Sequence, residues 1–167
     1  MEEDTLQIFR RQIGAWIESL LARGRYPFRR IDLTQPLLTK AGELSPDLIL
    51  WINRDSFMAG GLLLVTGRNE ADDIERGRYC AEALGLQHFL TWSATEVVFW
   101  EICGDSISRH RALTTPPPGS EPAAFRDLLV SILDELKYLA VAGSTAPAQL
   151  PPQYLANLCR ITLADVQ

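Results

Sequence analysis

The pattern of apolar and polar positions is clearest in the middle third of the chain. Two nearly continuous apolar runs stand at residues 48–52 and 62–65, and the pair Gly60-Gly61 marks the return of the chain into the second run after a turn. Such runs, bounded by turn residues, are typical of central strands covered on both faces. A charged segment with helical spacing follows at 69–84, and a third apolar run at 88–90. The pattern therefore predicts strand, strand, helix and strand in that order.

The segments before this stretch predict a helix and then a strand. Apolar residues recur at three- and four-residue steps from Leu6 to Leu20, which is the stripe of an amphipathic helix, and Gly24 follows where a C-cap is expected. Residues 28–33 alternate apolar and polar side chains, the period of a half-buried strand. Residues 34–45 contain a proline and a glycine and predict a loop or a short irregular strand.

The second half of the chain adds strands and then helices. The run 97–100 predicts a strand next to the one before it, and 107–113 predicts an edge strand. A proline-rich linker follows at 116–122. Residues 125–139 define a second long amphipathic helix, and the tail 154–166 has helical spacing without a capping stop.

Together these segments predict an α/β fold, with a mixed central sheet of about five or six strands flanked by helices and a C-terminal helical extension. Residues 1–115 are expected to form the core. Residues 116–167 are expected to form a linker and a helical segment that packs on the core as one compact unit. The uncapped tail is also compatible with a fragment of a larger protein.

Composition places the chain among ordinary globular domains. Its 167 residues are enough for one well-buried core, and its apolar runs are far shorter than the roughly 20 residues that span a bilayer. The acidic start, Met1-Glu2-Glu3-Asp4, is unlike the basic beginning of a secretory signal, so we expect a cytoplasmic protein without a membrane partner. A net charge of −5 argues against broad electrostatic capture of DNA.

The cysteines, tryptophans and N-terminal arginines suggest where side chains lie. The three cysteines are widely spaced in mostly apolar surroundings and are predicted to be small buried hydrophobes, and the four tryptophans are predicted to be core residues. Six arginines cluster in the first thirty residues and could form a basic face for nucleic acid, or only a solvated helix face and turn. The residues are Cys80, Cys103 and Cys159; Trp16, Trp51, Trp92 and Trp100; and Arg10, Arg11, Arg23, Arg25, Arg29 and Arg30.

The order of these features resembles a known family. Asp47 follows Pro46 at the start of a strand, a second strand ends near charged residues, and a helix with Arg78-Tyr79 leads to a third strand. This order, over roughly residues 5 to 102, resembles the PD-(D/E)XK (restriction endonuclease-like) superfamily. It is most similar to the nuclease-like domain that opens the R subunits of type I restriction enzymes. The resemblance implies a restriction-endonuclease-like fold and a DNA context.

The chemistry that the resemblance implies is metal-assisted phosphodiester hydrolysis. Two carboxylates hold Mg²⁺, and a nearby lysine orients the nucleophile or neutralises developing charge. Asp47 matches the first acid, whereas the second acid and the lysine would fall near Thr66 and Arg68. Thr66 supplies no carboxylate, and Arg68 is a poor proton shuttle because it stays charged. The motif is therefore degenerate, and Asp47 could equally be a cap at the entry of its strand.

A rearranged site remains an alternative. Glu70, Asp72 or Asp73 could reach back from the start of the helix as a second ligand, with Arg68 holding phosphate. The resemblance also implies an acidic residue on the first helix that supports the metal, and Glu18 is the candidate, with a surface glutamate as the favoured alternative.

Three functions follow from these observations. The first is a catalytically degenerate domain that needs no cofactor and acts as a structural or docking module in DNA processing or defence. The second is an active Mg²⁺-dependent endonuclease built from Asp47, Glu70 or Asp72, and Arg68. The third is a protein–protein interaction domain, dimeric through its late helix, which would need an exposed apolar patch within residues 125–166.

Overall fold

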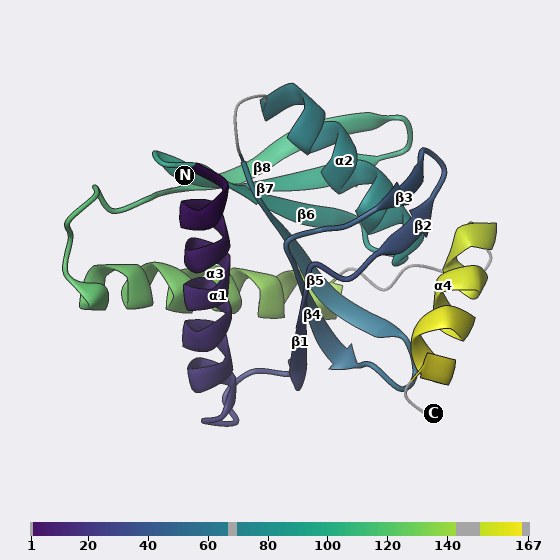
Figure 1. Ribbon diagram of the computed structural model, residues 1–167, viewed down its shortest axis with the longest axis horizontal. Helices are drawn as coiled ribbons and strands as arrows, with labels where there is room; N and C mark the ends of the chain where they lie inside the picture. Colours follow the sequence, from purple (N-terminus) through teal and green to yellow (C-terminus); the bar gives the residue numbers. More distant parts are fainter. Residues whose placement is uncertain (1, 67–69, 143–150, 165–167) are drawn as a thin grey trace.

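The computed structural model describes residues 2–66, 70–142 and 151–164 (Figure 1). Arg68 and Asn69 lie outside the described residues. The elements are α1 (Glu2–Leu21), β1 (Arg30–Leu33), β2 (Leu37–Thr39), β3 (Gly42–Leu44), β4 (Leu48–Asn53), β5 (Met58–Val65), α2 (Glu70–Ala83), β6 (His88–Trp92), β7 (Glu96–Cys103), β8 (Ser106–Thr114), α3 (Pro122–Ala142) and α4 (Pro152–Ala164).

Within the described residues, six strands form one mixed sheet in the order β1-β4-β5-β6-β7-β8. β5 and β6 are parallel and are connected by α2, whereas the other neighbouring pairs are antiparallel. A parallel pair needs a crossover of this kind, and the helical segment between the two apolar runs supplies it. The predicted α/β architecture, with a sheet of about five or six strands and a C-terminal helix, is confirmed.

Both faces of the sheet are covered, which explains the continuous apolar runs of the central strands. Leu48, Leu50, Leu63 and Val65 face the layer of α1 and α3. The residues between them face the other layer, where α2, α4 and the β2–β3 hairpin pack; they are Ile49, Trp51, Leu62 and Leu64. Figure 1 shows these helices around the sheet. Adjacent residues of β4 and β5 thus enter different halves of the core.

The glycine pair does not mark the beginning of a strand as predicted, because β5 begins earlier, at Met58. Gly60 and Gly61 lie inside β5 and are needed there for space. A Cβ on Gly60 would lie 2.4 Å from the Phe28 ring, and one on Gly61 would lie 3.1 Å from Leu136 of α3. The missing side chains let neighbouring elements approach the strand closely.

Residues 34–45 were expected to be a loop or a short irregular strand, and they form the small β2–β3 hairpin. The side chain of Asn157 on α4 completes its edge. The Asn157 amide donates to the Leu38 carbonyl at 2.8 Å, and its oxygen accepts from the Leu38 N–H at 2.8 Å. Asn157 is fully buried, so α4 docks through a side chain that acts like a neighbouring strand.

The prediction that the cysteines are buried is right for one of them. Cys80 is buried on the inner face of α2, but Cys103 at the end of β7 and Cys159 on α4 are exposed. The tryptophans are closer to expectation: Trp51 and Trp92 are fully buried, and Trp16 and Trp100 are half-buried against the two core clusters. None of the described helices is long and apolar enough to cross a membrane.

Candidate functional site

The start of β4 and the ends of β5 and β6 lie side by side, on the edge of the sheet that runs across the strands, and Asp47 lies there. Asp47 immediately precedes β4, and its backbone N–H donates to the Leu63 carbonyl of β5 at 3.1 Å. β5 ends at Val65, and the next residue, Thr66, donates its N–H to the Trp92 carbonyl at the end of β6 at 2.8 Å. This is the edge where the family resemblance implies an active site.

The Asp47 carboxylate is buried and already engaged. The side chain is about 5% exposed, and its Oδ2 accepts a hydrogen bond from the Val65 N–H at 2.6 Å. Its Oδ1 lies 2.6 Å from Nε of Arg10, which reaches the site from α1. That Nε has no hydrogen-bond partner, so the contact is an ion pair without hydrogen-bond geometry. Both carboxylate oxygens therefore have a protein partner.

A second arginine lies on the other side of the carboxylate. Nη2 of Arg76 on α2 is 3.7 Å from Oδ2 of Asp47 and 3.2 Å from Oδ1 of Asp73. The guanidinium thus bridges two carboxylates, which is the relation that a divalent cation has to its ligands in a nuclease of the kind implied by the resemblance. Here the positive charge belongs to the protein itself.

Burial decides the ionisation of Asp47. Burial raises the pKa of this carboxyl, and the Val65 hydrogen bond and the charges of Arg10 and Arg76 lower it by less in total. The neighbouring carboxylate of Asp73 adds to the increase in the pKa. The two arginines therefore stabilise the charged form without fully replacing the water that it has lost.

Thr66 is held by the neighbouring strand. The side chain is half-buried, and its hydroxyl donates to the Trp92 carbonyl at 3.2 Å. The backbone N–H of Thr66 has the same acceptor. Because Arg68 lies outside the described residues, the structure does not test its predicted position.

Of the acids at the beginning of α2, it is Asp73 that is joined to Asp47 through Arg76. Glu70 and Asp72 are exposed in the first turn. The carboxylate of Asp73 is about 15% exposed and shares Arg76 with Asp47. The structure therefore brings together Asp47 and Asp73 across Arg76.

The first helix contributes a cation to this edge. Glu18 is exposed, and it is two turns, or roughly 12 Å, along α1 from Arg10. Arg10 was not identified as a site residue from the sequence, although a signal existed: it precedes Ile13 by three residues and Ile17 by seven, so it lies on the buried stripe. An arginine on an apolar stripe predicts a buried acidic partner.

This set of donors does not fit Mg²⁺. Hard divalent cations take several oxygen ligands, and here one carboxylate is bound to a backbone N–H and faces two guanidinium groups. Among residues 2–66, 70–142 and 151–164, no group of three or more histidine, cysteine, aspartate and glutamate side chains is arranged to hold a metal.

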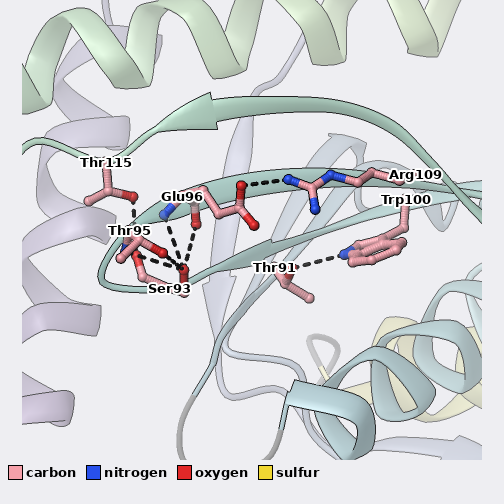
Figure 2. A network of polar contacts seen from close by, with 7 residues as sticks. All are labelled: Thr91, Ser93, Thr95, Glu96, Trp100, Arg109 and Thr115. Atoms are coloured by element: carbon pink, nitrogen blue, oxygen red, sulfur yellow. Dashed lines mark hydrogen bonds and ion pairs between the residues drawn. The ribbon is translucent and has the colours of Figure 1, made fainter.

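The neighbouring turn between β6 and β7 uses its polar groups internally (Figure 2). Ser93 Oγ accepts from the N–H of Thr95 at 3.3 Å and of Glu96 at 3.1 Å. Thr115 donates its hydroxyl to the Ser93 carbonyl at 3.1 Å, and Arg109 forms an ion pair with Glu96. These contacts fix the turn that lies beside Thr66. The hydroxyl groups of the turn residues are used in hydrogen bonds to the turn itself.

The N-terminal arginines are divided between two places. Arg10 is at the Asp47 edge, whereas Arg30 pairs with Trp51 in the β1–β4 register, at the end of β4 away from Asp47. The exposed members of the cluster are Arg11, Arg23, Arg25, Arg29 and Arg30. Counted along β4, the register position of Arg30 lies roughly 10 Å or more from Asp47.

No protein-family model and no curated protein matches this chain. A search of solved structures finds the type IIG restriction endonuclease BpuSI, with 12% identity and a TM-score of 0.57 over 93% of this chain. A complex of DrdV with DNA matches 80% of this chain, with 14% identity and a TM-score of 0.46. This chain spans 19% of the BpuSI chain and 12% of the DrdV chain. The likeness to BpuSI shows that the fold is restriction-endonuclease-like.

Proposed function

We propose that this chain is a restriction-endonuclease-like domain without catalysis of its own, which acts as a structural or docking module in DNA processing or defence. The observation that carries the proposal is the state of Asp47. Its carboxylate lies at the strand end where the family resemblance implies a metal ligand, and it is bound to Val65 and Arg10. The link to type I R subunits stays a prediction.

Electrostatics supports the loss of metal chemistry. A divalent cation about 5 Å from one guanidinium would be repelled by about 7 kcal/mol at an effective dielectric constant of 20. Binding with millimolar affinity supplies only about 4 kcal/mol. Arg10 and Arg76 would both have to move before an ion could use Asp47, and Arg10 is largely enclosed.

The docking role is supported by the setting of the related fold. In BpuSI, the matching region is about a fifth of the chain, so the fold occurs there as one part of a larger enzyme. A domain that keeps this fold and lacks the metal ligands can still position neighbouring domains or partners near DNA. The DNA context comes from this likeness in fold.

The test is a calorimetric titration with Mg²⁺ and Mn²⁺, paired with plasmid nicking. Wild type and Asp47→Ala are compared, and Asp32→Ala serves as the matched control because Asp32 is a partly buried aspartate that is also paired with arginines. We expect no saturable metal binding and no nicking by any of the three. Saturable binding and nicking by wild type and Asp32→Ala, both absent in Asp47→Ala, would establish a rearranged nuclease and refute the proposal.

Direct nucleic-acid contact is proposed for the arginines beyond the end of α1. Arg23, Arg25, Arg29 and Arg30 are exposed there. Replacing Arg29 and Arg30 by glutamine should weaken binding to a labelled duplex and reduce the slope of log K against log salt by about 1 for each phosphate that is no longer neutralised. The control is Arg109→Gln on β8. Equal weakening by both replacements would remove the arginine cluster from the proposal.

A further inference from the structure

α4 packs on the core through its inner face and exposes apolar side chains on its outer face. On the inner face, Asn157 and Ile161 are buried, and Tyr154 packs edge-on against Phe57 at 4.9 Å between ring centroids. On the outer face, Leu155 and Leu163 are each 63% exposed. Cys159, halfway between them, is also exposed.

The outer face of α3 shows what a solvated helix face looks like in this protein. Its exposed positions include Arg126, Asp127, Asp134 and Lys137. Within the described residues, α4 carries one charged side chain, Arg160, and that side chain is paired with Glu43 of β3 at 3.2 Å. A helix face turned to water normally carries charged and polar residues, so the outer stripe of α4 is suited to contact with protein.

The spacing of the stripe identifies a partner. Leu155 and Leu163 lie four residues on either side of Cys159, with equal exposure, so the stripe is the same when its direction is reversed. We infer that α4 packs against α4 of a second copy of this chain, related by a twofold axis that passes between the two Cys159 residues. Leu155 of each copy then meets Leu163 of the other, as an isologous contact requires.

The geometry of helix packing is compatible with this arrangement. Residues at i, i+4 and i+8 form one ridge, and such ridges on two helices run parallel to each other at a crossing angle of roughly −50°. A small residue at the crossing point allows close approach, and Cys159 is in that position. For helix axes 8–10 Å apart, the two Cys159 Cα atoms would be roughly 3–5 Å apart, and the wider separations are within reach of a disulfide bond.

Charge and area determine the strength of this contact. Two identical surfaces attract poorly when each carries net charge, and this stripe carries none, since its three members are leucine, cysteine and leucine. Three side chains cover less than the roughly 800 Å² per partner that is typical of stable complexes. The dimer is therefore weak and depends on concentration.

The first test is sedimentation velocity across about 5 to 500 µM, a range in which a weak dimer forms by mass action. We expect the weight-average sedimentation coefficient of wild type to rise with concentration. It should not rise in Leu155→Glu or Leu163→Glu. Tyr138→Glu is the matched control, because Tyr138 is an equally exposed side chain on α3, at 67%. A wild type that stays monomeric over the whole range, or a Tyr138→Glu variant that fails to show the rise, would overturn the inference.

The second test uses the native cysteines and does not rely on glutamate variants that could disturb folding. Diamide, which takes up two electrons and two protons from a pair of thiols, should convert wild type and Cys103→Ser to a disulfide-linked dimer. Cys159→Ser should remain monomeric under the same conditions. Cys103 is the internal control because it is equally free and exposed, on β7. Crosslinking through Cys103, or none through Cys159 at high protein concentration, would place the contact elsewhere or exclude it.

Discussion

Two aspartates in this protein have nearly the same surroundings, at different places in the sheet. Asp32 on β1 accepts from the Trp51 indole N–H at 2.9 Å and pairs with Arg54 at 2.7 Å and Arg30 at 3.4 Å. Asp47 accepts from the Val65 N–H at 2.6 Å and pairs with Arg10 and Arg76. Each has one neutral N–H donor and two arginines.

The comparison bears on the function of Asp47. Asp32 lies on the edge strand β1, opposite Ile49 of β4. Its side-chain contacts run to Trp51 and to Arg54 beyond the other end of β4, so they connect β1 to β4 and to the turn after it. The contacts of Asp47 connect α1, β5 and α2 in the same way. The same set of partners at both places supports a structural role for Asp47, although the family resemblance implies a metal ligand at its position.

The Asp47 side chain is more deeply buried than that of Asp32, so replacing each by alanine should lower the free energy of unfolding by different amounts. The Asp47 side chain is 5% exposed and that of Asp32 is 13% exposed. Asp47→Ala should lower the free energy of unfolding by about 3 kcal/mol, because it leaves buried arginine charge and the Val65 N–H without a partner. Asp32→Ala should cost about 2 kcal/mol, the cost of charge-assisted hydrogen bonds. Urea denaturation measures both, and a larger decrease for Asp32→Ala would contradict the comparison.

A smaller effect is expected in the pairwise coupling of each aspartate with one arginine. A double-mutant cycle on Arg10 and Asp47 should give a coupling free energy of about 1–2 kcal/mol, because Arg10 is only 16% exposed. The cycle on Arg30 and Asp32 should give less than about 1 kcal/mol, because Arg30 is 53% exposed and water screens the pair. Equal coupling in the two cycles would mean that burial does not distinguish them.

The smallest effect is on the pH dependence of stability. Burial raises the pKa of Asp47 above its ordinary 3.8, so between 3.8 and the raised value the folded state keeps a proton that the unfolded state has released. The free energy of unfolding should therefore fall as the pH rises through that window. Asp47→Asn lacks the titrating group, so the difference between wild type and this variant should fall with pH and then level off. A difference that rises with pH would mean that the arginines outweigh burial.

Local patterns predicted the elements of this fold well, because their signals lie within a few residues. The apolar runs at 48–52 and 62–65 became β4 and β5, and the stripe from Leu6 to Leu20 became α1. Short-range patterns predicted burial less well, because burial depends on elements that are distant in the sequence. Cys103 follows an isoleucine and Cys159 follows a leucine, and both are nevertheless exposed, because one ends a strand at a hairpin and the other is on the outside of a helix.

The sequence by itself determined that Asp47 lies at a strand entry and that Thr66 provides no second carboxylate. Only the tertiary structure decided what surrounds Asp47. Arg10 and Arg76 are 37 and 29 residues away in the chain and come from different helices, so no local pattern connects them to it. The physical reason is that a buried carboxylate must recover the interactions it loses with water, and the groups that replace that water are chosen by packing in space.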